Sequence, residues 1–98
     1  MGKAVTFFGA ADIPHCSGMT RFGHSTDVRV GGLGVSRKDD LNTPHLKPCG
    51  FACCGHVAPI TIGSTTVFAN GKGIGRVGDH IIGCTKVAEG AENVFAGG

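Results

Sequence analysis

The chain repeats itself, and this repeat limits the possible folds more than any other feature. Residues 25–40 (STDVRVGGLGVSRKDD) align without a gap on residues 64–79 (STTVFANGKGIGRVGD), and seven of the 16 positions are identical. Residues 91–97 (AENVFAG) match the start of this unit, and residues 4–10 (AVTFFGA) match its end more weakly. The two partial copies together make one further unit, split between the termini. We number the units by the order of their ends in the chain, so the first ends at Ala10, the second at Asp40 and the third at Asp79. We therefore expect a closed, pseudo-three-fold scaffold in which the first and last segments complete each other.

The composition predicts one small domain, residues 1–98, that needs a metal, disulfides or a partner to stay folded. With 98 residues, 18 Gly and no Trp or Tyr, the chain offers few large side chains for a core. Its N-terminus has no signal-peptide pattern, so we expect synthesis in the cytoplasm, where thiols stay reduced. An odd number of cysteines, five, does not suit a disulfide framework. The net charge is only +2, without the aromatic and basic interleaving typical of nucleic-acid binding.

Turn residues predict an all-β fold of short hairpins. Asn70 and Gly71 separate two short apolar segments, and a type I′ hairpin turn needs the positive φ that these residues tolerate. Gly31 and Gly32 stand at the same place in the first copy. No segment has a sustained apolar period of 3.6 residues, so no long helix is expected. Residues 40–64 interrupt the repeat with three Cys, two His and three Pro, which predicts a functional loop.

Three equivalent positions carry metal-ligating residues. His15, His45 and Cys84 each stand five residues beyond the end of a repeat unit. Imidazole and thiolate are the ligands that zinc prefers, and structural zinc takes four of them in tetrahedral geometry. Ligands related by a near three-fold axis leave the fourth vertex open, and His56 is the residue we expect there.

Other residues compete for these places. Cys16 is the alternative to His15, and Cys49 or Cys53 is the alternative to His56. His24 and His80 do not follow the spacing, so we expect them on the surface or in turns.

The repeat resembles that of the PAAR-repeat proteins. Residues 64–79 are similar to the core repeat of this family, with GIGR at residues 73–76 in place of Pro-Ala-Ala-Arg, and residues 90–97 are similar to its closing segment. The resemblance covers nearly the whole chain. The sequence departs from the family in lacking Pro at these sites, in having Phe7 where the family has Arg, and in having Lys38 and Asp39 in place of an apolar residue and Gly.

The resemblance implies a small β-rich cone that caps the trimeric β-helical spike of a type VI secretion system or a contractile phage tail. It implies one structural Zn²⁺ near the apex, held by His15, His45, His56 and Cys84. The expected role is to sharpen the spike for membrane piercing, with one cone per trimer, and with effector or cargo proteins as further candidate partners. Assembly then occurs at the spike tip, with delivery to the target cell envelope. Val67, Phe68, Val94 and Phe95 are the residues expected to contact the spike.

No enzymatic activity is expected, because four protein ligands leave zinc no open position for water. Two alternatives remain. A stand-alone zinc-binding adaptor module has the same His and Cys content, and a zinc-dependent hydrolase needs a three-ligand site with a general base such as Asp12 or Asp79.

Overall fold

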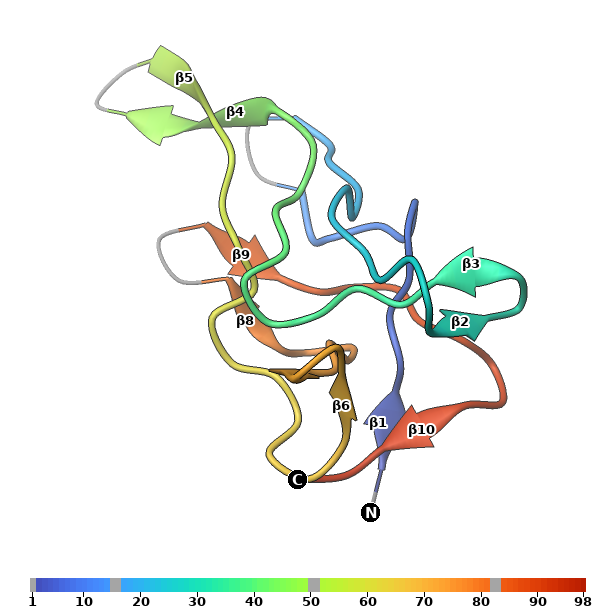
Figure 1. The fold of residues 1–98 in the computed structure, drawn as a ribbon. Helices are drawn as coiled ribbons and strands as arrows, with labels where there is room; N and C mark the ends of the chain where they lie inside the picture. The colour runs from blue at the N-terminus through green and yellow to red at the C-terminus, as the bar shows by residue number, and fades with distance from the viewer. Residues whose placement is uncertain (1, 15–16, 50–51, 82–83) are drawn as a thin grey trace.

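The computed structural model describes residues 2–14, 17–49, 52–81 and 84–98, and for residues 47–49 and 52–54 it describes the backbone alone. Across these ranges the chain is entirely β, with ten short strands and no helix (Figure 1). None of the described elements is a helix that could cross a membrane. The strands are β1 Lys3–Ala4, β2 Arg29–Val30, β3 Leu33–Gly34, β4 His45–Cys49, β5 Ala52–His56, β6 Phe68–Ala69, β7 Lys72–Gly73, β8 His80–Ile81, β9 Thr85–Lys86 and β10 Phe95–Ala96.

All the strands pair as antiparallel two-stranded units, and the hairpins that the sequence predicts are present. β2 pairs with β3 through Gly31 and Gly32, which both have positive φ. β6 pairs with β7 through Asn70 and Gly71, with φ of 55° and 79°. Positive φ at both central residues is the signature of a type I′ turn, whose twist matches that of the strands.

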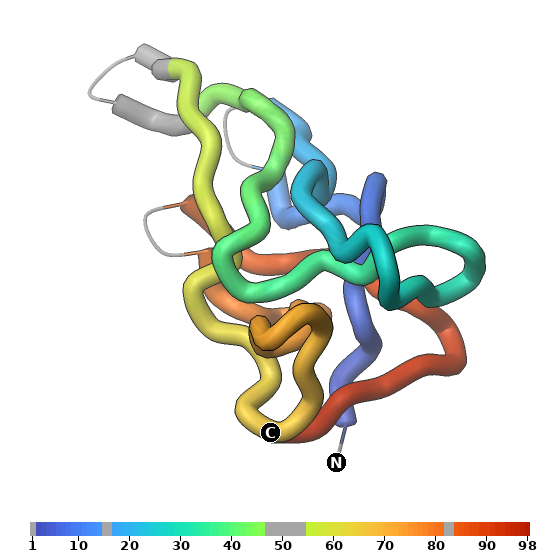
Figure 2. Tube along the Cα trace, in the orientation of Figure 1, coloured from blue at the N-terminus to red at the C-terminus, as the bar shows by residue number. Residues whose placement is uncertain are grey.

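The two ends of the chain form the remaining hairpin, that of the first unit. β1 pairs with β10 in the register Lys3↔Ala96, which is equivalent to Leu33↔Val30 and Lys72↔Ala69 in the other two units. The two termini accordingly lie close together (Figure 2). The prediction that the first and last segments complete one unit is confirmed.

A ring of three backbone hydrogen bonds marks the pseudo-three-fold axis. The amide of Thr6 donates to the carbonyl of Gly75 at 3.0 Å, that of Gly75 to Ser36 at 2.8 Å, and that of Ser36 to Thr6 at 3.1 Å. These are equivalent residues of the three units, and the ring is closed. Around it, the apolar side chains come in two symmetric sets, Val5, Val35 and Ile74 and then Val30, Ala69 and Ala96.

The ring packs so tightly that one of its members has no room for a side chain. A Cβ at Gly75 would lie 2.8 Å from Cδ1 of Ile60 and 2.9 Å from the carbonyl oxygen of Ser36. We expect Gly75→Ala to lower the free energy of unfolding by about 1–3 kcal/mol, because the overpacked neighbours are themselves buried. Chemical denaturation measures this. Gly18→Ala is the control, because its Cβ would meet nothing within 4 Å, and an equal effect of the two substitutions would contradict the prediction.

The molecule is elongated, and the ends differ. It measures 40 × 23 × 23 Å along its principal axes. The hairpins of the three repeat units lie toward one end with the termini, and β4–β5 projects from the other (Figure 1). A second apolar cluster consists of Ala58, Ile60, Ile81 and Val87, and Cys84 packs against it.

The β4–β5 hairpin falls in the segment for which the sequence predicts a loop. Its strands are five residues long, in the register His45↔His56 to Cys49↔Ala52. Proline and glycine weigh against strands in a wide sheet, but both strands of a two-stranded hairpin are edge strands, where these residues are tolerated.

Candidate metal centre

Three equivalent connections converge at the end of the molecule opposite the termini. They start at the pairs Ala11↔Thr20, Leu41↔Pro59 and His80↔Lys86, which occupy the same place in the three units. The first connection carries His15, the second carries His45 and His56, and the third carries Cys84. The spacing of five residues beyond the end of each unit therefore corresponds to one equivalent sequence position near the start of each connection.

His45, His56 and Cys84 form one compact group. One donor atom from each lies within 4.8 Å of the donor atoms of the other two, so together they could hold a metal ion. Nε2 of His45 is 3.1 Å from Sγ of Cys84. The rings of His45 and His56 are paired across β4 and β5, with centroids 4.3 Å apart and planes at 63°. His45 is buried, and the other two are half-buried.

The hydrogen bond at the far side of His45 prepares it for coordination. Its Nδ1 lies 2.8 Å from the carbonyl oxygen of Thr43. A carbonyl oxygen accepts only, so Nδ1 carries the proton and donates it. Nε2 then presents its lone pair toward Cys84. This arrangement, with one ring nitrogen on a backbone carbonyl and the other on the metal, is the usual state of a metal-bound histidine.

The donor set suits zinc in type and in spacing. With Zn–S of about 2.3 Å and Zn–N of about 2.0 Å, tetrahedral geometry places N and S donors about 3.5 Å apart. The 3.1 Å between Nε2 of His45 and Sγ of Cys84 is close to this value, and all three donor atoms lie within 4.8 Å of one another. Two imidazoles and a thiolate also favour a borderline-soft transition metal over calcium or magnesium, which prefer oxygen ligands.

The structure brings together three of the four residues predicted as ligands. His15 lies outside the described residues, as does its alternative Cys16. The side chains of Cys49 and Cys53 are likewise outside the described part, so the choice of the fourth ligand stays a prediction. His80 is exposed, as expected. His24 is half-buried, and its ring packs edge-on against that of Phe8, with centroids 4.9 Å apart.

A buried polar chain behind the metal centre was not predicted from the sequence. Nδ2 of Asn42 donates to Sγ of Cys84 at 3.7 Å and to Oδ2 of Asp12 at 3.3 Å. Arg21 lies against the same carboxylate oxygen, with NH1 at 3.5 Å. All three residues are almost fully buried. The alignment of the repeats could have indicated that Asp12 and Asn42 are buried, because they stand where the third unit has the core residue Ile81.

Burial opposes the charges of this ion pair. Desolvation raises the pKa of Asp12, and the attraction of Arg21 and the Asn42 hydrogen bond offset this only in part. Desolvation likewise lowers the pKa of Arg21 against the attraction of Asp12. Burial thus shifts both pKa values in the direction that disfavours the charged form, in spite of the attraction between the two side chains.

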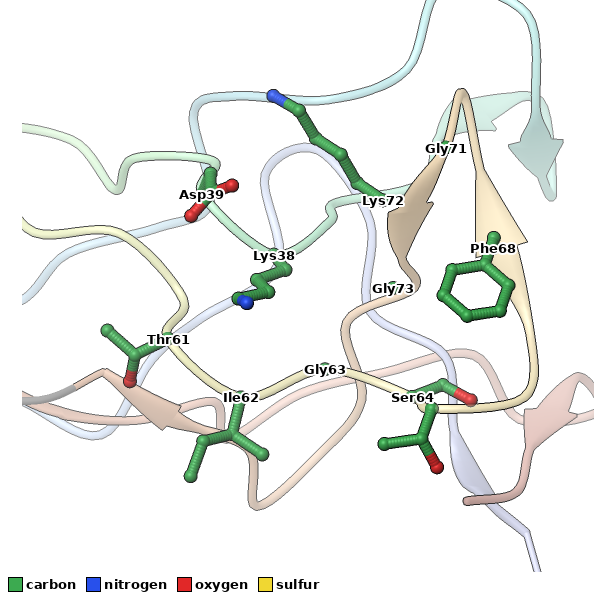
Figure 3. A pocket seen from close by; sticks show the side chains of 11 residues that line it. Lys38, Asp39, Thr61, Ile62, Gly63, Ser64, Phe68, Gly71, Lys72 and Gly73 are labelled. Atoms are coloured by element: carbon green, nitrogen blue, oxygen red, sulfur yellow. The ribbon is translucent and has the colours of Figure 1, made fainter.

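The hollow shown in Figure 3 lies away from the His/His/Cys group. It separates the end of the second unit from β6–β7, and none of the three grouped residues lines it. The side chains of Lys38 and Lys72 extend away from Phe68 rather than toward a common point (Figure 3). The hollow therefore presents no converging set of functional groups, unlike the His/His/Cys group.

No protein-family model matches the chain, and none of the curated proteins matches it in sequence.

Proposed function

We propose that this chain is the structural tip of a trimeric β-helical spike, in a type VI secretion system or a contractile phage tail. The observation that carries the proposal is the closed ring of hydrogen bonds from Thr6, Ser36 and Gly75. A single chain that caps a trimer must present three like surfaces around one axis. The pseudo-three-fold ring supplies that symmetry within one subunit, in line with the resemblance to the PAAR-repeat proteins.

The end that carries the repeat hairpins fits the role of the docking base. Val28, Val67 and Val94 occupy equivalent positions there and are nearly equally exposed, at 37%, 39% and 39%. Next to them, Phe68 and Phe95 are 57% and 59% exposed, so these side chains are not part of the core. Repeated apolar residues at one end favour contact with a partner of the same symmetry.

At the other end, one Zn²⁺ bound by His15, His45, His56 and Cys84 would crosslink the three connections. Zinc has no redox chemistry of its own, which suits an inert point. Both candidate general bases of the hydrolase alternative are already engaged, since Asp12 faces Arg21 and the Asp79 carboxylate accepts two side-chain hydrogen bonds from Arg76. Their burial, with 2% of each exposed, further supports a structural metal.

The remaining parts of the proposal follow from this role. The chain is made in the cytoplasm, joins the spike there, and touches the target membrane only during injection. Effector or cargo proteins are candidate partners on the outer surface, and nucleic acid is not. The zinc-binding adaptor remains the alternative, and it predicts the same metal content without affinity for a spike.

Stoichiometry of binding tests the proposal. The chain is mixed with the β-helical spike trimer produced by the same organism or prophage, and the complex is weighed by native mass spectrometry. We expect one chain per trimer. Val67→Asp should weaken binding by at least about tenfold, because a charge would be desolvated at the interface. Ile13→Asp, at a somewhat more exposed site outside the three base hairpins, is the control.

Two results would overturn the spike-tip role. One is a zinc-loaded, folded chain that does not bind the trimer, which is the outcome that the adaptor alternative predicts. The other is binding of three chains per trimer, which would make the internal symmetry irrelevant to docking.

A further inference from the structure

Both polar atoms of the Asn42 side-chain amide are hydrogen-bonded, which fixes the orientation of the amide. Its Oδ1 accepts from the amide of Ala58 at 2.9 Å, and its Nδ2 donates to Asp12 and to Cys84. A backbone amide can only donate, so Oδ1 must face Ala58 and the two N–H groups must face the carboxylate and the sulfur. Asn42 is 1% exposed, so no water competes for these contacts.

The fold does not need polar residues at these positions. The residue equivalent to Asp12 and Asn42 in the third unit is Ile81, which is buried in the second apolar cluster. The residues equivalent to Arg21 are Ile60 and Val87, from the same cluster. Aliphatic side chains thus pack well at two of the three equivalent positions, and Arg21 occupies the remaining one. Apolar residues commonly replace a buried ion pair at no loss of stability.

We therefore look for the effect of the buried polar chain on the atom at which it ends, the sulfur of Cys84. Arg21 holds Asp12, Asp12 accepts from Asn42, and Asn42 donates to Sγ. A hydrogen bond from N–H to a thiolate withdraws electron density from sulfur and stabilises its charged form, which is the form that binds metal.

We propose that Asn42 is a positioning residue of the metal centre, whose amide donates to the Cys84 thiolate and is held in place by the buried pair of Asp12 and Arg21. This inference rests on the metal centre of the proposed function. Residues that orient the ligands of a metal commonly change its affinity by about 10–100-fold when they are replaced.

The test compares the full-length wild type with Asn42→Leu, loaded with Zn²⁺ or with Co²⁺ as a spectroscopic probe. We expect zinc affinity, measured by chelator competition, to fall by about 10–100-fold in the variant. The sulfur-to-cobalt charge-transfer band should move to longer wavelength, because an unbonded thiolate holds its electrons less tightly. A merely structural role of Asn42 would leave this band in place. Ile60→Val, in the neighbouring apolar cluster, is the control for altered packing.

A second variant covers the case in which Asn42→Leu does not fold. In Asp12→Leu/Arg21→Met the amide of Asn42 remains but loses its support, and the apolar pair should fold because the third unit carries the aliphatic residues Ile81 and Val87 at these positions. We expect weaker zinc binding and the same direction of band shift. Wild-type affinity and band position in the folded variants would overturn the inference while leaving the metal centre intact. A wild type that takes up neither metal would overturn both.

Discussion

Cys84→Ala is expected to lose its bound zinc and most of its folded structure together. Cys84 contributes the thiolate of the His/His/Cys group, and it also packs against the apolar cluster of Ala58, Ile60, Ile81 and Val87. In a small domain with a limited core, the binding energy of a structural metal is folding energy. The loss should therefore approach the whole stability of such a domain, about 5 kcal/mol or more.

The measurement is metal content by mass spectrometry, combined with thermal unfolding followed by circular dichroism. Wild type should carry close to one zinc per chain. Stripping zinc from wild type with a chelator should reproduce the effect, and adding zinc back should reverse it, which separates metal loss from the packing change. His80→Ala, at an exposed histidine on the neighbouring strand β8, should keep its zinc. Well-folded wild type without zinc would refute the ligand assignment.

Arg76→Met is expected to destabilise the domain by about 3–5 kcal/mol. Arg76 and Asp79 form an ion pair in which the side chains are only 4% and 2% exposed. The guanidinium donates to both carboxylate oxygens, from Nε at 3.1 Å and from NH2 at 2.9 Å. It also donates to the carbonyl oxygen of Gly97 at 2.9 Å, which ties the turn to the C-terminal segment. Removing the arginine leaves a buried carboxylate without its charge partner.

The first unit of the chain supplies the matched control for this prediction. Phe7 and Ala10 stand there where the third unit has Arg76 and Asp79. The double variant Arg76→Phe/Asp79→Ala should therefore lose much less stability than either single substitution. Arg37→Met should also cost less than Arg76→Met, because the side chains of Arg37 and Asp40 are 15% and 7% exposed. Chemical denaturation of the set gives the coupling energy, and simple additivity of the single effects would contradict the account.

The repeat carries enough information to predict the hairpins and their closure. A two-residue turn such as Asn70–Gly71 fixes the register of its strands, and aligned copies transfer that register from unit to unit. The weak copy at residues 4–10 could be interpreted as part of a repeat unit only because the copy at residues 91–97 supplies the missing part. The same alignment brought His45 and Cys84 together, because equivalent positions in a closed three-fold domain lie around one axis.

The parts that sequence reasoning missed depend on tertiary surroundings. Asp12 and Arg21 are charged, and charged residues are almost never fully buried unless they are paired, so their residue types point away from the core. Only the alignment of Asp12 with the core residue Ile81 points the other way. The pair joins residues from the two ends of the first connection. The strands β4 and β5 were missed for a different reason, because Pro48 and Gly55 are typical of loops and only the absence of a wider sheet makes them acceptable.

The pairing of β1 with β10 makes the position of the chain ends almost arbitrary with respect to the fold. Since Lys3 lies opposite Ala96, a short linker could join the two ends, and the chain could be opened instead at Gly31–Gly32 or Asn70–Gly71. Each of these circular permutants would have the same three hairpins, with the break in a different unit. A protein fused to such a permutant would leave the domain on a different side of the pseudo-three-fold axis. In the proposed spike complex, this offers a way to vary the attachment of a fused protein without altering the domain itself.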